Sequence, residues 1–388
     1  MKKTIFTFLA FFILYGCTRE VQSSFNHPFT EFESDAKSFH WFDIPGMICR
    51  DGSPTGIGYR VGSPKKLAIY VNGGGACFNS ETCGPNPKSF DQNDWLALSA
   101  EYGNRGIFDA DNGKNPLKDF SFVFVPYCTG DVHSGTKPNG RALGLADTQR
   151  YVGSYNFIKS MDFIQPYFDY NKVEEVVLFG LSAGGYGVYV NFLEVTKRFP
   201  NAKITVINDS GPLFSDAQAF PICLQLGFTF IFGLPLPSDL LGCCGKPELG
   251  LANVYEYSSK KFPNANFGFV SSYEDATSRF FLSFGYNNCT GAPGNQLPAA
   301  VFRDGIKNLR DDILKPKSSW STYYINGDSH TMLASNELFY DRNISGMYLY
   351  EWVDKLMKRA SADLSLIYQP IHTNTYHQLL FHKQCHLK

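Results

Sequence analysis

The chain has 388 residues, of which 44% are hydrophobic, so it is long and apolar enough for one large domain or two smaller ones. Its formal net charge is −1, from 35 basic and 36 acidic residues. Such a balance supplies no basic field for nucleic acid and no acidic tail, which argues against partners recognised mainly by bulk charge. The composition is that of an ordinary globular protein.

The N-terminus, "MKKTIFTFLAFFILYGC", is expected to lie outside the fold. Two lysines precede an apolar run over residues 5–15, which is too short for a permanent membrane span and is typical of an export signal. The segment 1–17 closes in "LYGC", which resembles a bacterial lipobox; cleavage before Cys17 would leave a diacylated cysteine that holds the protein on a membrane. Residues 18–39 would then be a tether. A plain secretory signal with an incidental cysteine is the alternative.

Export also affects how the other nine cysteines are interpreted. An oxidising compartment favours disulfides, and no group of these cysteines has convincing zinc-site spacing. Their order does not determine the pairing, and one cysteine must be left over, for which Cys385 in the tail is the candidate. The nine are Cys49, Cys77, Cys83, Cys128, Cys223, Cys243, Cys244, Cys289 and Cys385.

Short apolar runs alternate with amphipathic segments from residue 65 onward. Helical patterns cover residues 154–168 and 187–198. Strands that are buried on both faces and separated by helices predict an α/β domain, here residues 40–359, with a mostly parallel sheet. The six predicted strands lie in "KKLAIYVNGGG", "FSFVFVPYCTGD", "VEEVVLFGLSAGG", "AKITVINDSGP", "ANFGFVSSYED" and "STYYINGDSH".

Two regions depart from this alternation. An insertion at about 213–262 contains the apolar stretch 221–245, which glycine and proline interrupt too often for a transmembrane helix. It is predicted to be a cap that walls a substrate pocket, with simple core packing as the alternative. The tail 360–388 holds four of the eight histidines. A solvated extension is expected there, and metal binding is the alternative.

The segment "GLSAG", residues 180–184, matches the G-x-S-x-G turn that carries the nucleophilic serine of α/β-hydrolases. The pattern by itself is weak evidence. An apolar strand directly before it and a helical segment directly after it supply the context that the motif requires, and the glycines suit a tight, strained turn. The sequence therefore predicts Ser182 as a nucleophile in an α/β-hydrolase-like fold.

A serine hydroxyl needs a base, and in this fold the order along the chain is serine, acid, histidine. That order excludes His27, His40 and His133, which precede Ser182. Among the later histidines, only His330 lies in a loop directly after a predicted strand, "TYYINGDSH". His330 is therefore the predicted general base, with a surface turn histidine as the alternative interpretation.

The acid should follow the preceding strand, where its carboxylate can orient the imidazole. Asp275 in "GFVSSYEDATSRFF" occupies that place. Glu274, Asp328 and Asp209 compete for the role, and each is interpreted as a turn or helix-cap carboxylate.

Donors for a developing oxyanion, each worth roughly 3 to 4 kcal/mol, are expected in "NGGGACF". A glycine cluster after a strand resembles the HGGG-type loop of esterases, and the backbone N–H groups of Gly74, Gly75 and Ala183 are the candidates. A phosphate-binding loop is the rival interpretation, but the trailing Gly-Lys-Ser/Thr and the G-x-G-x-x-G pattern are missing from it.

Taken together, "NGGGACFNSETC", "VPYCTGDVHSG", "GLSAGGYGVYVN", "NDSGP" and "GDSHTML" resemble the pectin acetylesterase and Notum family of serine carboxylesterases, in a bacterial version. The resemblance spans about residues 42–358. It implies Ser182 as nucleophile, Asp275 as acid, His330 as base, and Gly74, Gly75 and Ala183 around the oxyanion.

The chain departs from the family pattern beside the glycine cluster. Ala76 stands where plant members tend to carry tryptophan, and Asn72 stands where they have an acidic residue. The resemblance also implies that His133 lines the site in a supporting role. The mouth of the pocket is therefore expected to differ from that of other members.

These observations predict a membrane-tethered, exported serine esterase that uses no metal and no cofactor. Its expected substrates are O-acyl esters, with acetyl groups on a polysaccharide foremost, and the family name does not fix the acyl length. The alternative is a catalytically silent surface lipoprotein that uses the hydrolase scaffold to bind glycans or a host surface.

Overall fold

The computed structural model describes residues 38–359, except for residues 216, 245, 287–288, 290–295 and 318. The predicted export signal with Cys17, all but the last two residues of the predicted tether, and the histidine-rich tail with Cys385 lie outside the described residues.

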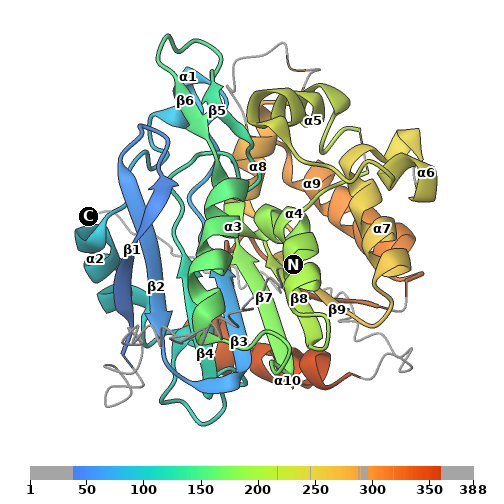
Figure 1. Ribbon diagram of the computed structural model, residues 1–388. Helices are drawn as coiled ribbons and strands as arrows, with labels where there is room; N and C mark the ends of the chain where they lie inside the picture. The colour runs from blue at the N-terminus through green and yellow to red at the C-terminus, as the bar shows by residue number, and fades with distance from the viewer. Residues whose placement is uncertain are drawn as a thin grey trace, which may run out of the picture.

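An eight-stranded sheet forms the centre of the described part of the chain (Figure 1). Its spatial order is β1-β2-β4-β3-β7-β8-β9-β10. The six strands from β4 to β10 run parallel, whereas β1 and β2 pair antiparallel at one edge. The strands are β1 His40–Ile48, β2 Pro54–Arg60, β3 Ser63–Val71, β4 Phe120–Val125, β7 Glu175–Leu181, β8 Lys203–Asp209, β9 Asn266–Ser272 and β10 Trp320–Ile325.

Both faces of the parallel strands are buried, as the continuous apolar runs predicted. In β7, Val176 and Leu178 pack into one core, and Val177 and Phe179 pack into a second core on the opposite face. The mostly parallel α/β sheet is thus confirmed. The strands β1 and β2 were not predicted, because Pro45 and Gly46 and scattered polar residues give their sequences no clear period of two.

Helices cover both faces of the sheet. In Figure 1, α3 and α4 lie in front of it, and α10 lies behind its lower end. The longer helices are α2 Gln92–Tyr102, α3 Gly153–Ile164, α4 Ala183–Arg198, α7 Asn253–Lys261, α8 Ala276–Ser283, α9 Ala299–Asn308 and α10 Leu349–Lys358. Short elements are α1 Ser80–Cys83, the hairpin β5 Lys137–Gly140 with β6 Gln149–Tyr151, the pair β11 Asn343–Ile344 with β12 Met347–Tyr348, and the single turns η2 Gly106–Phe108, η3 Gln165–Tyr167, η6 Leu309–Leu314 and η7 Glu337–Asp341.

The chain between β8 and β9 forms a separate group of short helices beside the sheet (Figure 1). One side of this insertion is part of the core, because Leu224, Phe228 and Phe232 are buried there. Its outer side exposes Ile222 and Phe230. The group consists of α5 Ile222–Phe228, η4 Thr229–Gly233, α6 Leu240–Cys244, η5 Pro247–Ala252 and α7.

Eight cysteines pair in the structure, which confirms the expectation of disulfides and fits an exported protein. None of the helices within the described residues is long and apolar enough to cross a bilayer. The pairs, which the sequence order left open, are Cys49–Cys128, Cys77–Cys83, Cys223–Cys289 and Cys243–Cys244.

Candidate active site

The candidate site lies where the strand order of the sheet reverses. The strands β3 and β7 are neighbours, while β4, which comes between them in the chain, pairs with the other edge of β3. Loops that leave the carboxyl ends of two such strands diverge, and the crevice between them is where open α/β sheets bind ligands. Gly73 to Gly75 follow β3, and Ser182 follows β7.

Ser182 occupies the sharp turn that the sequence motif predicted. Its backbone has φ 57° and ψ −118°, a strained state for a residue with a side chain. The turn is fixed on both sides, because the Ser182 amide donates to the Asp209 carbonyl at 2.7 Å and the Ser182 carbonyl accepts from the Gly185 amide at 2.9 Å. The serine is therefore held at the junction of β7 and α4.

The glycines of the motif are required by close backbone approaches. A Cβ on Gly184 would lie 1.9 Å from the Val71 carbonyl oxygen of β3. A Cβ on Gly180 would lie 2.1 Å from the Gly184 carbonyl oxygen. Since backbone cannot move aside as a flexible side chain does, only glycine lets α4 start so near to β3.

The glycine loop after β3 is held against Ser182. A Cβ on Gly73 would lie 3.1 Å from the Cβ of Ser182. The Gly74 carbonyl accepts from the Asn86 side-chain amide at 2.7 Å, and the Gly75 carbonyl accepts from the Tyr127 hydroxyl at 2.8 Å. Both carbonyls are thus fixed, and with them the peptide planes of the loop.

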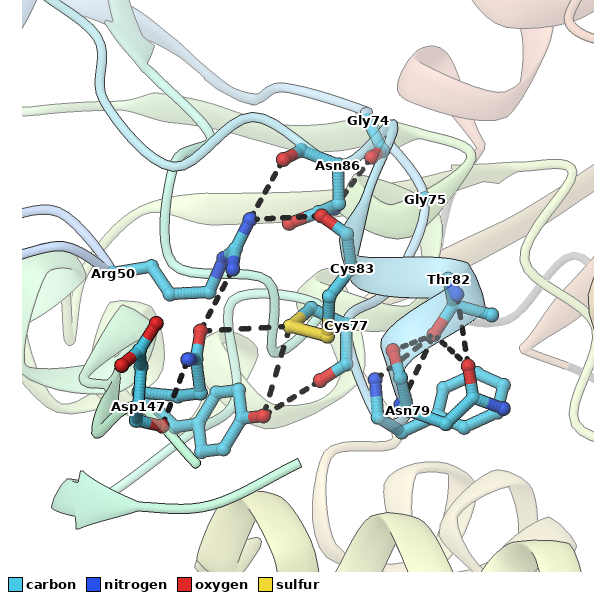
Figure 2. Close-up of a disulfide and its surroundings, with 12 residues drawn as sticks. Arg50, Gly74, Gly75, Cys77, Asn79, Thr82, Cys83, Asn86 and Asp147 are labelled. Atoms are coloured by element: carbon cyan, nitrogen blue, oxygen red, sulfur yellow. Dashed lines mark hydrogen bonds between the residues drawn. A yellow bond between two sulfur atoms is a disulfide. The ribbon is translucent and has the colours of Figure 1, made fainter. Parts of the chain in front are cut away.

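A buried arginine and a disulfide support this loop from below (Figure 2). Arg50 donates to the Asn86 carbonyl at 2.7 Å and to the Cys83 carbonyl at 3.3 Å. The Cys77–Cys83 disulfide closes the short segment that follows the glycines. The Cys77 carbonyl accepts from the Tyr151 hydroxyl at 2.7 Å. The loop is therefore anchored on both sides of its bend.

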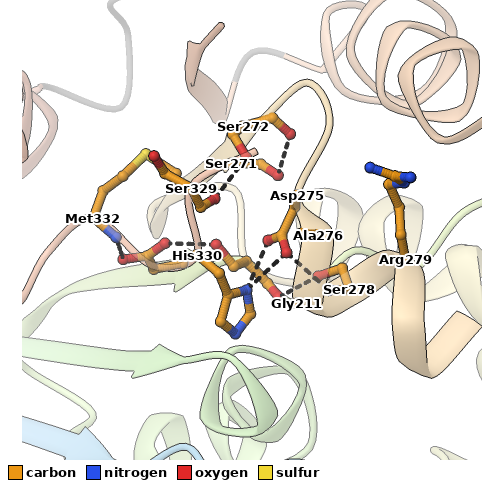
Figure 3. A network of polar contacts seen from close by, with 12 residues as sticks. Gly211, Ser271, Ser272, Asp275, Ala276, Ser278, Arg279, Ser329, His330 and Met332 are labelled. Carbon is orange, nitrogen blue, oxygen red and sulfur yellow. Dashed lines mark hydrogen bonds and ion pairs between the residues drawn. The ribbon is translucent and has the colours of Figure 1, made fainter. Parts of the chain in front are cut away.

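His330 and Asp275 come together across the ends of β10 and β9. His330 Nδ1 lies 2.7 Å from Asp275 Oδ2 and 2.9 Å from Oδ1, and Figure 3 shows the ring and the carboxylate pointing toward one another. Asp275 is fully buried and caps α8, where its Oδ1 accepts from the Ser278 amide at 2.8 Å. Ser182 and His330 line the same recesses of the surface.

Two of the three competing carboxylates lie away from the histidine. Glu274 forms an ion pair with Arg303, and Asp328 is exposed in the turn after β10. Within the part of the chain that the structure describes, neither carboxylate forms a hydrogen bond with the His330 ring.

Asp209, by contrast, is no turn or cap carboxylate, and here the sequence interpretation was wrong. It is fully buried, and its Oδ2 accepts from the amides of Met332 at 2.7 Å and Leu333 at 2.8 Å. Burial raises the pKa of Asp209 to about 6. The only sequence signal for the role of Asp209 was the position of a carboxylate at the end of an apolar strand. That position does not reveal hydrogen-bond partners more than a hundred residues away.

His133 lines neither recess, contrary to what the resemblance implied. It is 1% exposed, and its Nε2 donates to the Asn72 carbonyl at 2.7 Å. Burial lowers the pKa of His133 to about 4. His133 is therefore a neutral support beneath the glycine loop.

Two recesses open beside Ser182. The large recess has a volume of about 430 Å³ and the small recess of about 30 Å³. Gly75, Ser182, Thr277 and His330 line both. The large recess is otherwise walled by aromatic and aliphatic side chains from α2 and the sheet, which carried no motif and which sequence reasoning missed. They include Phe39, Tyr70, Trp95, Leu98, Tyr102 and Phe124.

A strand-turn-helix serine and a histidine paired with a buried aspartate, on a mostly parallel sheet, define the α/β-hydrolase class of folds. The solved structure of the Wnt deacylase Notum from Drosophila has the same fold. It superposes with a TM-score of 0.59 and 17% identity, over 82% of this chain and 92% of that one.

Sequence comparison shows similarity to one family of esterases. The model of the Pectinacetylesterase family matches residues 36–228, which include the glycine loop and Ser182 but not Asp275 or His330. Over this segment, about half of the chain, the protein is similar to the pectin acetylesterase and Notum family.

Among curated proteins, a palmitoleoyl-protein carboxylesterase NOTUM of Schmidtea mediterranea is 28% identical over 187 residues, 45% of this chain and 34% of that protein. The notum2 of Xenopus laevis is 30% identical over 158 residues, 39% of this chain and 31% of that protein. The human NOTUM is 25% identical over 188 residues, 44% and 35% of the two chains. The matches span about a third of the length of these relatives.

Proposed function

We propose that this protein is a serine carboxylesterase that hydrolyses O-acyl esters through an acyl-enzyme on Ser182. The observation that carries the proposal is the buried Asp275 carboxylate at 2.7 Å from His330 Nδ1, beside a serine in a strained turn. A carboxylate on Nδ1 leaves Nε2 as the nitrogen that exchanges protons with the serine and the substrate.

Each residue has a defined step in this proposal. Ser182 Oγ attacks the ester carbonyl carbon while His330 Nε2 takes its proton, and the N–H groups of Gly74, Gly75 and Ala183 stabilise the oxyanion. The carbon–oxygen bond to the alcohol breaks, and the alcohol leaves with the proton from His330. Water then attacks the acyl-enzyme while His330 takes its proton. The bond from the acyl carbon to Ser182 Oγ breaks, His330 returns the proton to Ser182 Oγ, and the carboxylic acid leaves.

We propose acetyl groups on a polysaccharide as the natural target. The relatives carry names that refer to pectin acetyl esters in one branch and to a palmitoleoyl ester on a protein in the other. The small volume of one recess beside Ser182 supports the shorter acyl group.

Labelling with a fluorophosphonate tests the proposal. The intact protein should gain one adduct, located on Ser182 by peptide mass spectrometry, and Ser182→Ala should gain none. Hydrolysis of 4-nitrophenyl acetate should disappear in the same variant. A wild-type protein that is folded, unlabelled and inactive on all esters would instead favour the silent binding scaffold.

We also propose that a lipid on Cys17 holds the domain on a membrane, as the lipobox-like "LYGC" indicates. Expression in a bacterial host with radiolabelled palmitate should label the wild-type protein and leave Cys17→Ser unlabelled. Labelling of both proteins would contradict the assignment to Cys17.

A further inference from the structure

The two recesses that meet at Ser182 differ greatly in volume, about 430 Å³ against about 30 Å³. An ester has two arms, the acyl group and the alcohol, which diverge from the carbon that Ser182 attacks. Each recess therefore suits one arm, and the residues around the recesses indicate which.

The small recess has room for little more than a methyl group. Its volume of about 30 Å³ is only two to three times the roughly 10–15 Å³ that suffices for one water molecule, which leaves no space for a long acyl chain. Its walls include Tyr186, Phe228 and Leu282. The Phe281 ring closes it against the glycine loop, since a Cβ on Gly75 would lie 2.6 Å from that ring.

The large recess has a fixed aromatic floor. The Tyr70 ring packs on Phe179 and Phe108, with ring centroids 5.0 and 4.9 Å away. The Trp95 ring packs on Phe124 at 4.8 Å. These side chains are buried in the second core and are therefore preorganised.

The rim of the large recess connects this floor to the site. The Tyr70 hydroxyl donates to Asn72 Oδ1 at 2.9 Å, which links the floor to the glycine loop. Leu98, Ser99 and Tyr102 from α2 are half-buried at the opening. A ring-shaped group can enter between this helix and the glycine loop and pack its flat face on the aromatic floor.

The position of the loop that carries His330 indicates which arm of the ester lies in the large recess. Thr331 and Ala334, which follow His330, line the large recess and are not among the residues of the small one. The oxyanion donors do not distinguish the recesses, because Gly74 lines the large one, Ala183 lines the small one and Gly75 lines both. Since His330 must protonate the departing alcohol, the alcohol arm lies along the histidine loop.

We infer that the large recess is the leaving-group subsite, which receives an alcohol with a ring that packs on the floor, while the small recess restricts the acyl arm to about acetyl size. The inference rests on the proposed esterase function. Both an aromatic ring and the apolar face of a sugar ring have the required chemistry.

The test varies the two arms separately. Ethyl, benzyl and 2-naphthylmethyl acetate, together with an acetylated methyl glycoside, vary the alcohol, and benzyl acetate, butyrate and octanoate vary the acyl group. We expect kcat/KM of the wild-type protein to be at least about 10-fold higher for 2-naphthylmethyl acetate than for ethyl acetate. It should fall at least about 10-fold from acetate to butyrate.

Variants assign each preference to its recess. Leu98→Trp should fill the large recess and lower kcat/KM for the naphthylmethyl ester at least about 10-fold more than kcat/KM for ethyl acetate; Ser99→Trp is a second variant with the same expected effect. Leu96→Trp is the matched control, because Leu96 lies on the same helix and is 57% exposed. Phe281→Ala should raise kcat/KM for the butyrate and leave the alcohol preference unchanged.

The outcomes separate this inference from the function beneath it. If the protein hydrolyses the esters but neither Leu98→Trp nor Ser99→Trp changes the alcohol preference, the subsite alone is overturned. The same conclusion follows if these two variants change the preference for acyl length. No hydrolysis and no Ser182 adduct would overturn the esterase function and the subsite together. If Leu98→Trp lowers kcat/KM for both the naphthylmethyl ester and the glycoside, the recess binds a sugar ring. If it lowers kcat/KM for the naphthylmethyl ester alone, the recess binds an aromatic alcohol.

Discussion

The Asp209 carboxylate accepts a hydrogen bond from the Met332 amide at 2.7 Å, across 123 positions of the chain. The Leu333 amide binds the same oxygen, and the Asp209 carbonyl accepts from the Ser182 amide. One residue thus connects the turn that carries the serine to the loop that carries His330. Asp209 is therefore a positioning residue in the proposed reaction.

Replacing Asp209 should impair activity through His330. We expect Asp209→Ala to lower kcat by about 10–100-fold, with KM little changed, because a loop displaced by about 1 Å has costs of that order. Asp209→Asn should recover most of the rate, since its Oδ1 still accepts from both amides. Steady-state kinetics and the rate of fluorophosphonate labelling check this; equal loss in both variants would argue against positioning through these hydrogen bonds.

Asp209 should also make folding stability depend on pH. Its pKa is about 6 in the folded protein, against 3.8 for an unperturbed aspartate, so the folded state binds the proton more tightly. Its stabilising contribution is therefore present at low pH and is lost as the pH rises through 6. Relative to Asp209→Asn, the wild-type protein should lose about 2 kcal/mol of unfolding free energy between pH 4.5 and 7.5.

Urea unfolding of both proteins across that range measures the effect. Asp131, whose pKa burial raises to about 6, and His133, whose pKa burial lowers to about 4, titrate in both proteins and cancel in the difference. A difference that is flat with pH would contradict the raised pKa of Asp209.

The acid of the site should be distinguishable from its neighbour in sequence. Asp275→Asn removes the charge that orients His330 and should lower kcat by about 10⁴-fold. Glu274→Gln, at the adjacent position, breaks a partly exposed ion pair with Arg303 and should leave kcat within about two-fold, with a stability change of at most about 1 kcal/mol. Kinetics on an activated acetate ester give the comparison, and similar losses in both variants would refute the assignment.

Two glycines in helices should respond oppositely to alanine. At Gly184 the added Cβ would lie 1.9 Å from backbone of β3, so Gly184→Ala should cost about 3 kcal/mol or more. At Gly227 in α5 no atom lies within 4 Å of the added Cβ, and Gly227→Ala should stabilise by about 0.5–1 kcal/mol. Thermal and urea unfolding test both predictions. If Gly184→Ala left the unfolding free energy unchanged, the turn at Ser182 would need no glycine at this position.

Two disulfides should separate stability from activity. The Cys49–Cys128 bond closes a separation of 79 positions, and loop entropy gives about 4.5 kcal/mol for its removal. The Cys77–Cys83 bond spans 6 positions and should contribute only about 2 kcal/mol, yet it supports the glycine loop. Double serine variants of the second pair should therefore lose more kcat and less unfolding free energy than those of the first.

The local pattern of the sequence determined much of this protein. Continuous apolar runs between helical segments predicted the parallel strands, because a strand buried on both faces cannot alternate with polar residues. The sharp turn around Ser182 could also be predicted from the sequence, because its glycines are required by close contacts that the turn itself creates near the serine. His330 and Asp275 followed from chain order, and the structure brings them into contact.

Only the tertiary structure decided what depends on contacts between distant segments. The pairing of the cysteines, the antiparallel pairing of β1 with β2, and the hydrogen bond from the Met332 amide to Asp209 join positions whose spacing in sequence carries no period. The same is true of the large recess, where Trp95 and Tyr102 of α2 meet Tyr70 of β3 beside Ser182. Side chains that form a pocket obey no local rule, because their arrangement is set by how the layers pack.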